Sequence, residues 1–227
     1  MIIVRGGGDL ATGTIYKLHE CGYHVLVLET DRPTAIRRKV SFCEAVYEGT
    51  FQVEDAVCRR VNTTEQCQQA WKAHEIPLMV DPDGTMIRNL QPQAVIDAIL
   101  AKRNLGTSKD MAKLTIALGP GFCAGKDVDY VIETKRGHQL GRVIAQGSAL
   151  PNTGVPGVIA GYGAQRVIHA PADGPIQVRS QIGSVVKQGQ TLAVIGADSI
   201  SVPATLDGVL RGIIRDGFAV KKGLKIA

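Results

Sequence analysis

The residues with the clearest chemical pattern form a glycine turn near the start of the chain. The turn reads Gly6-Gly7-Gly8-Asp9-Leu10-Ala11-Thr12-Gly13 and follows an apolar segment, residues 1–5, that predicts a strand. Gly6 would allow a tight turn, Gly8 would let the backbone approach a pyrophosphate, and Ala11 would let the next helix pack closely on the strand. We therefore predict a binding site for a dinucleotide-like cofactor, with a structural turn that binds nothing as the alternative.

An acidic residue stands where a dinucleotide site needs one. Residues 23–28 predict a second buried strand, and Glu29 ends it. A strand, a helix and a second strand within about 30 residues form a βαβ unit, in which an acid at this place receives ribose hydroxyls. Glu29 is therefore predicted to contact the cofactor.

A second glycine turn follows a later predicted strand, residues 114–118. It runs Gly119-Pro120-Gly121-Phe122-Cys123-Ala124-Gly125. The carboxyl ends of parallel strands lie at one edge of a sheet, so two such turns suit a ligand with extended phosphates. We count Gly119, Gly121, Phe122 and Gly125 as candidate cofactor contacts, and a hairpin-like loop is the alternative. Cys123 is a candidate nucleophile, although structural cysteines are commoner.

A polar segment, residues 133–142, gathers three cations, an acid and a histidine between apolar stretches. Arginine side chains suit phosphate and other oxo-anions, and a nearby histidine could move a proton. Arg136, His138 and Arg142 are therefore candidate ligand contacts, and His138 is also a candidate catalytic residue. The alternative is a charged surface hairpin with a solvated histidine.

Strands and helices alternate over the first two thirds of the chain. Residues 61–74 and 92–102 predict helices, and residues 76–80 predict a further buried strand. This alternation predicts an α/β fold with a Rossmann-like, mainly parallel sheet and helices on both faces over residues 1–160.

The pattern changes near residue 150, where turn residues dominate, and residues 161–227 predict a small all-β domain. Two rounds of similar residues, containing Asp173-Gly174 and Asp207-Gly208, recur about 34 residues apart and indicate an internal duplication. The spacing resembles the barrel-sandwich hybrid of biotinyl and lipoyl domains. The segment that would carry the modified lysine reads Ser199-Ile200-Ser201-Val202-Pro203-Ala204, so we predict no swinging arm.

Composition limits the remaining classes. The net charge of +5 is spread along the chain, which argues against binding to DNA or RNA. Five cysteines without a CxxC spacing indicate neither disulfides nor a zinc site, and no metal site is predicted. There is no leader pattern and no apolar run of about 20 residues, so a cytoplasmic protein without a membrane segment is expected. A homo-oligomer stays open.

Five separated segments, in order, together resemble one known family. They are Arg5-Gly6-Gly7-Gly8-Asp9-Leu10-Ala11-Thr12-Gly13, Arg37-Arg38 with Val40, Phe42 and Glu44-Ala45-Val46, Ala101-Lys102-Arg103-Asn104-Leu105-Gly106-Thr107, Gly119-Pro120-Gly121-Phe122 with Ala124-Gly125, and Ile132-Glu133-Thr134 with Arg136-Gly137-His138 and Leu140-Gly141-Arg142. These segments resemble the YqeB-type accessory proteins of selenium-dependent molybdenum hydroxylase systems.

The resemblance implies a role in the maturation of a xanthine-dehydrogenase-like molybdenum hydroxylase, which would be the partner. It also suggests the ligand, because bacterial enzymes of this class commonly carry a molybdopterin dinucleotide, whose pyrophosphate suits a Rossmann turn. We expect an accessory protein rather than a stand-alone enzyme. The alternatives are an NAD(P)-dependent oxidoreductase and an assembly scaffold with a vestigial nucleotide site.

Overall fold

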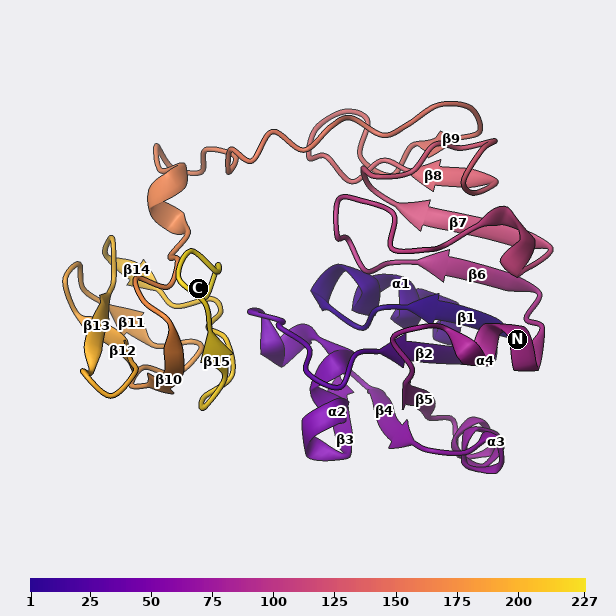
Figure 1. Cartoon of the computed structure of the whole chain (residues 1–227), viewed down its shortest axis with the longest axis horizontal. Coiled ribbons are helices and arrows are strands. Elements are labelled where there is room, and N and C mark those ends of the chain that lie inside the picture. The colour runs from indigo at the N-terminus through magenta and orange to yellow at the C-terminus, as the bar shows by residue number, and fades with distance from the viewer. The chain divides into compact units, whose positions relative to one another are not determined.

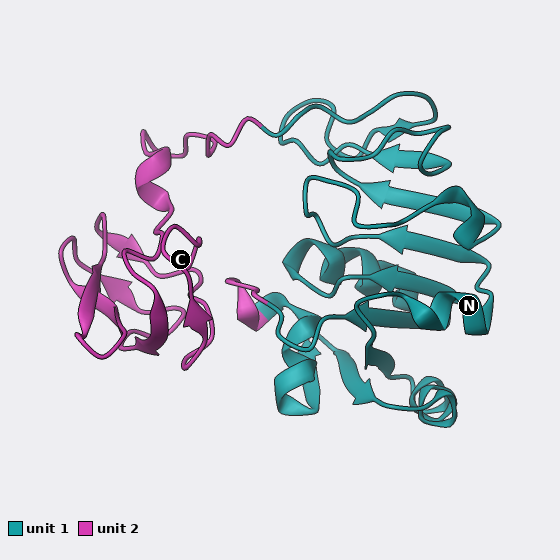
Figure 2. Cartoon of the chain, in the orientation of Figure 1, with its two compact units in different colours: residues 1–33, 40–152 teal, residues 34–39, 153–227 magenta.

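The computed structural model describes all 227 residues and divides the chain into two compact units (Figures 1 and 2). The first unit comprises residues 1–33 and 40–152, and the second comprises residues 34–39 and 153–227. The division therefore falls earlier than the expected domain boundary at residue 160. It also assigns to the second unit a short segment, Thr34–Lys39, that lies far from it in sequence.

The first unit is built on a nine-stranded sheet (Figure 1). Its strand order is β3-β4-β5-β2-β1-β6-β7-β8-β9, in which only the edge strands β3 and β9 pair antiparallel with their neighbours. The mainly parallel sheet predicted from the sequence is confirmed. The strands are β1 (Ile2–Arg5), β2 (Val25–Glu29), β3 (Thr50–Val53), β4 (Ala56–Val61), β5 (Ile76–Val80), β6 (Ala94–Asp97), β7 (Leu114–Leu118), β8 (Tyr130–Ile132) and β9 (Val143–Ile144).

Helices cover both faces of this sheet. Successive residues of a strand point to opposite faces, so Val4 of β1 packs with Ala11 and Ile15 of α1, whereas Ile3 packs with Ile87 of α4. Each helix buries its apolar side against one of these two layers. The helices are α1 (Asp9–Glu20), α2 (Ala45–Glu48), α3 (Thr64–Lys72) and α4 (Thr85–Leu90), and the 3-10 turns are η1 (Arg38–Val40), η2 (Phe42–Glu44), η3 (Lys109–Met111) and η4 (Ala164–Arg166).

One predicted helix is wrong. Residues 92–102 contain strand β6, and the nearby helix is α4, which precedes them. All four residues of β6 are buried, and a short apolar run of this kind fits a buried strand as well as a buried helix. The predicted helix at residues 61–74 exists as the shorter α3, where the Thr63 side chain accepts a hydrogen bond from the Gln66 N–H at 3.3 Å.

The chain changes direction within the sheet between β1 and β6. It runs from β1 through β2 toward β5 on one side, and from β6 through β7 to β8 on the other. The six central strands, β5-β2-β1-β6-β7-β8, have the order of dinucleotide-binding domains, whose ligands bind at the carboxyl ends of the strands where the order reverses, and β4 and β3 extend the sheet beyond β5. The connections after β6 and β7 contain no α-helix, so loops occupy this edge of the sheet.

The second unit consists of short strands apart from η4. A four-stranded antiparallel sheet has the order β13-β12-β10-β15, and β11 pairs with β14. Its core is aliphatic and includes the fully buried Ile176, Leu192, Ile195 and Ile213. The strands are β10 (Gly174–Val178), β11 (Val185–Val186), β12 (Thr191–Ile195), β13 (Ile200–Pro203), β14 (Gly208–Val209) and β15 (Ala219–Val220).

The two similar rounds of sequence make the same hydrogen bonds with each other. Asp173 accepts from the Lys222 N–H at 2.6 Å, and Asp207, its counterpart in the second round, accepts from the Gln188 N–H at 2.7 Å. Matching backbone bonds join Gly183 to Leu210 and Gly217 to Ile176, both at 2.8 Å. Each round therefore completes the turns of the other, and the unit has an approximate twofold repeat.

The segment Thr34–Lys39 is held within this unit by specific contacts. Arg38 Nε donates to the Ile213 carbonyl at 2.9 Å, and Lys39 Nζ donates to the Ile182 carbonyl at 2.9 Å. A Cβ on Gly212 would lie 2.8 Å from the Ile36 carbonyl oxygen, so glycine is needed where the segment passes. The chain thus leaves the first unit after β2, contributes to the second unit and returns.

The repeat predicts matched effects on stability. Ile176→Ala and Leu210→Ala truncate equivalent buried side chains, so each is expected to lower the free energy of unfolding by about 2–5 kcal/mol. Val185→Ala is the control because this side chain is 75% exposed, and its effect should stay within about 0.5 kcal/mol. Urea denaturation followed by circular dichroism measures all three. Equal effects at Val185 and Ile176 would contradict the assigned core.

Candidate functional site

The first glycine of the N-terminal turn is required by the fold. Gly6 follows β1 with φ of +94°, a conformation that side chains disfavour. A Cβ at this position would also lie 3.0 Å from the Ala98 carbonyl oxygen and from backbone atoms of Ile99. Gly6 thus lets the turn after β1 pack against the loop after β6.

The fold places no such demand on Gly8. This residue caps α1 with φ of −66°, and a Cβ there would meet no atom within 4 Å. The first N–H groups of a helix lack partners within the helix, and they attract anions. Ala11 is fully buried against the sheet, as the fingerprint predicts, while Gly13 is an exposed helical residue beside open space.

A neighbouring segment holds the glycine turn in place. The Cys43 N–H of η2 donates to the Gly7 carbonyl at 2.8 Å, and a Cβ on Gly7 would lie 3.1 Å from the same nitrogen. Thr12 Oγ1 donates to the Gly8 carbonyl and accepts from the Phe42 N–H, both at 2.9 Å. Burial, with the nearby Glu29 charge, raises the pKa of the Cys43 thiol, so this group stays protonated at neutral pH.

Glu29 also contacts the turn. One carboxylate oxygen accepts from the Gly7 N–H at 2.8 Å, and the other accepts from the Thr30 N–H at 2.7 Å. Burial raises the pKa of Glu29, and these two N–H groups offset part of that rise. The carboxylate therefore organises the turn. Each oxygen keeps a second lone pair, so the predicted contact with a ribose hydroxyl remains chemically available.

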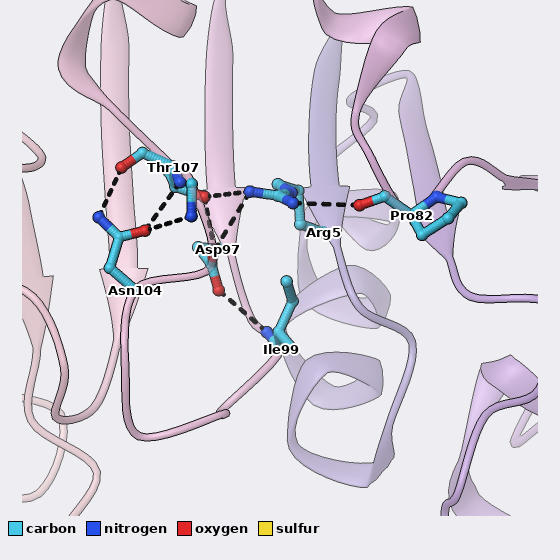
Figure 3. Close-up of polar contacts among 7 residues, drawn as sticks. Arg5, Pro82, Asp97, Ile99, Asn104 and Thr107 are labelled. Atoms are coloured by element: carbon cyan, nitrogen blue, oxygen red, sulfur yellow. Dashed lines mark hydrogen bonds and ion pairs between the residues drawn. The ribbon is translucent and has the colours of Figure 1, made fainter.

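A buried ion pair lies at the ends of β1 and β6, where the strand order reverses (Figure 3). Arg5 and Asp97 are register partners, only 5% and 2% exposed, and their closest charged atoms are 3.8 Å apart. Thr107 bridges them: its hydroxyl accepts from Arg5 at 2.5 Å and donates to Asp97 at 2.6 Å. Arg5 also donates to the Pro82 carbonyl at 3.3 Å.

The loop after β6 is anchored on this pair at both ends. Asp97 accepts from the Ile99 N–H at 3.2 Å near the start of the loop, and it is bound by Thr107 near the end. Asn104 accepts from the Gly106 and Thr107 N–H groups at 2.8 Å each. Leu100 and Lys102 have φ of +59° and +63°, conformations that cost on the order of 1–3 kcal/mol each and are typical of ligand-contact loops.

The second glycine turn lies at the same edge of the sheet, with β6 between β7 and β1. Its glycines serve packing: a Cβ on Gly119 would lie 2.6 Å from Thr134 Oγ1, and one on Gly121 would lie 2.6 Å from the Arg103 backbone nitrogen. Phe122 belongs to a small apolar core, and Gly125 has φ of +83°. The fold alone explains these residues, so their role in binding stays a prediction.

The side chains of the two candidate catalytic residues, Cys123 and His138, bond to no other polar side chain. Cys123 is partly exposed, and its thiol contacts only the Ala124 carbonyl, at 3.7 Å. His138, Arg136 and Arg142 are exposed on the hairpin between β8 and β9, with no hydrogen bond or ion pair from their side chains. These three side chains are exposed and unpaired, so their predicted contact with a ligand stays a prediction.

The one buried polar residue in the segment 133–142 is Glu133. Burial raises the pKa of this carboxyl, but hydrogen bonds from the Leu150 and Lys135 N–H groups, each at 2.8 Å, lower it below its ordinary value. Glu133 is thus a structural residue that fixes the base of the hairpin.

No three His, Cys, Asp or Glu side chains gather closely enough to hold a metal ion. No helix has the length and apolar character needed to cross a membrane. A cavity of about 670 Å³ is lined by residues in and around α4 and by the segment 108–113, and none of its lining residues is a predicted site residue.

Sequence reasoning missed the buried network of Arg5, Asp97 and Thr107 as part of the site. Two signals could have found it: a charged residue at the end of each of two buried strands, and Asn104 and Thr107 following within one loop. The second signal was obscured because residues 92–102 were predicted to form a helix, which hid the strand end at Asp97.

Comparison with known proteins gives one strong similarity. The chain is 46% identical over 226 residues to the uncharacterized protein YqeB of Escherichia coli K12. This similarity supports placing the chain in the YqeB family. The match covers all of the present chain and 41% of YqeB, so the chain spans about two fifths of the length of this relative. No protein-family model matches the chain.

Two solved structures show weak similarity. The apo structure of the ectoine utilization protein EutE (DoeB) from Ruegeria pomeroyi has a TM-score of 0.30 at 12% identity, over all of this chain and 84% of that one. An aspartoacylase family protein from Mesorhizobium loti has a TM-score of 0.32 at 13% identity, over all of this chain and 83% of that one. Scores this low support no conclusion about fold or activity.

The two glycines of the turn predict opposite outcomes on substitution. Gly6→Ala introduces a Cβ at positive φ against backbone atoms, so it is expected to lower the free energy of unfolding by about 2 kcal/mol or more. Gly8→Ala meets open space at ordinary φ, and its loss should stay below about 1 kcal/mol. Urea denaturation of the two variants tests this contrast. A larger loss at Gly8 would refute it.

Glu29 predicts a pH dependence of stability. Its pKa in the folded protein lies above the ordinary value of 4.5, so the folded state holds this proton more tightly than the unfolded state. The group's contribution to stability is therefore greatest below pH 4.5 and is lost as pH rises through the folded pKa. Glu29→Gln removes the titration, so the wild-type protein should lose stability relative to this variant as pH rises from 4.5. Urea titrations at several pH values measure this difference, and a constant difference would contradict the assignment.

Proposed function

We propose that the first unit binds a nucleotide-containing ligand at the carboxyl edge of its sheet, with the phosphates at the turn Gly6–Gly13. The observation that carries the proposal is the contrast between the glycines: Gly6 is needed for packing, whereas Gly8 faces open space at the amino end of α1. Gly13 and Gly157 also lie beside open space; Gly8 differs from them because it precedes the first N–H groups of α1, which lack partners within the helix and can bind an anion. The strand order supports the same location.

We further propose that the protein is a cytoplasmic accessory factor in the maturation of a selenium-dependent molybdenum hydroxylase, with that enzyme as its partner. Support comes from the family resemblance of the glycine and arginine motifs and from the similarity to YqeB. The ligand would be a molybdopterin dinucleotide. Its pyrophosphate fits a glycine turn in the same way as that of NAD does.

We also propose that the second unit is a barrel-sandwich hybrid without a modified lysine. Support comes from the duplicated hydrogen bonds of Asp173 and Asp207 across the two rounds. The hairpin between β12 and β13 carries Ser199 at φ of +51° and offers no lysine for modification. The unit would then serve as a fixed module rather than as a mobile carrier.

Nucleotide binding is tested by titration calorimetry. The purified protein is titrated with NAD, NADP, CTP and a purified molybdopterin dinucleotide. Gly8→Asp places a carboxylate where phosphate is expected, so repulsion and bulk should weaken binding of the true ligand by at least about tenfold. Gly157→Asp is the matched control, because Gly157 also has open space around it and ordinary φ.

The outcomes separate the alternatives. Tight NAD binding without binding of the molybdopterin dinucleotide would overturn the maturation role and favour the NAD(P)-dependent oxidoreductase, which a hydride-transfer assay then tests. If Gly8→Asp binds every ligand as well as the wild-type protein does, the turn is not the site. In that case unchanged complementation of hydroxylase activity by Gly8→Asp would favour a scaffold with a vestigial nucleotide site.

A further inference from the structure

The loop after β6 presents two adjacent cations at the edge where the proposed ligand would lie. Lys102 and Arg103 are both exposed, and no hydrogen bond or ion pair holds either side chain. They lie between Asp97 at the end of β6 and Thr107, which is bound back to Asp97 at 2.6 Å. The loop therefore has a fixed base and a free, positively charged tip.

The backbone of this loop has an unfavourable conformation, and neighbouring residues hold it there. Leu100 and Lys102 have positive φ. The loop also passes so close to Gly121 that a Cβ there would lie 2.6 Å from Arg103 N and 2.7 Å from Arg103 Cα. Strained loops held by their surroundings occur at ligand-binding sites, because the strain fixes the direction of the contacting groups. Here it fixes the backbone from which the two cationic side chains extend.

Nearby acids do not neutralise these cations. Asp97 is buried against Arg5 and Thr107, and Glu133 is buried under backbone N–H groups. Asp127 accepts a hydrogen bond from the Cys123 N–H at 2.8 Å. The next loop at this edge adds the exposed cations Lys135, Arg136 and Arg142. The edge over β6, β7 and β8 thus attracts negative charge, whereas the edge at β2 carries Glu29.

We propose that Lys102 and Arg103 bind an anionic group on the part of the ligand that extends from the glycine turn toward β6 and β7. Neighbouring strands lie about 4.8 Å apart, so a ligand with its first phosphates at β1 reaches this loop within one or two strand widths. The inference rests on the proposed nucleotide site and narrows its ligand class. The ligand is a nucleotide with additional negative charge beyond the phosphates bound by Gly8.

The test compares a charge-neutralised loop with a matched control. The probes are CTP, inorganic tripolyphosphate and NAD, which has no phosphate beyond its pyrophosphate and should bind the loop variant as it binds the wild-type protein. Lys102→Gln with Arg103→Gln should weaken CTP and tripolyphosphate binding by about tenfold or more, because hydrogen bonds to charged groups are lost. Lys221→Gln with Lys222→Gln removes the same charge from an exposed pair in the second unit and should leave affinity within about twofold.

Salt dependence gives a second readout. Exposed ion pairs are screened by salt, so wild-type affinity for CTP should fall as the salt concentration rises, and the double loop variant should show a shallower fall. Equal salt dependence in both proteins would argue against direct contact with phosphate.

The possible failures are distinguishable. CTP binding that is lost in Gly8→Asp but unchanged in the double loop variant overturns this inference and leaves the nucleotide site intact. Tripolyphosphate binding that depends on Lys102 and Arg103, together with CTP binding insensitive to Gly8→Asp, supports the cationic loop and overturns the turn. Absence of both CTP and tripolyphosphate binding to the wild-type protein overturns the inference.

Discussion

The buried pair of Arg5 and Asp97 is the interaction on which the edge of the sheet depends. Charges removed from water are tolerated only when they are paired and hydrogen-bonded, and Thr107 meets that condition by bonding to both. The pair also fixes two neighbouring segments. Arg5 directly precedes the glycine turn, and Asp97 precedes the loop that packs against that turn at Ile99. The pair thus fixes the two sides of the point where the strand order reverses.

Glycines in this unit serve two different physical ends, and only the structure separates them. Gly6 and Gly121 make room for backbone that passes too close for any side chain. Gly8 has neither a close neighbour nor an unusual φ. The sequence pattern treats all three alike, because a glycine turn looks the same whether its empty side faces protein or solvent. The case for a ligand contact is therefore stronger at the first glycine turn and at the loop after β6 than at the second glycine turn.

The sequence predicts the parallel sheet and the βαβ start because long-range order there follows from local periodicity. It fails at β6, where Ala94–Asp97 is short and wholly buried, so periodicity does not distinguish a strand from a helix. It also misses Thr34–Lys39, whose place in the second unit depends on hydrogen bonds to Ile182 and Ile213, far away in sequence. Glu29 ends β2 as expected, but its bonds to the turn are set by backbone geometry that spacing alone does not reveal.

The groups concentrated at this edge suit the proposed binding role. Backbone N–H groups at the start of α1 and the cations Lys102 and Arg103 are of the kinds that attract anions, and they need no change of protonation to do so. The nearest thiol, Cys43, is kept protonated by burial beside Glu29. His138 stands exposed on a separate hairpin. This arrangement agrees with the proposed role, in which the edge holds a phosphorylated ligand for delivery to another protein.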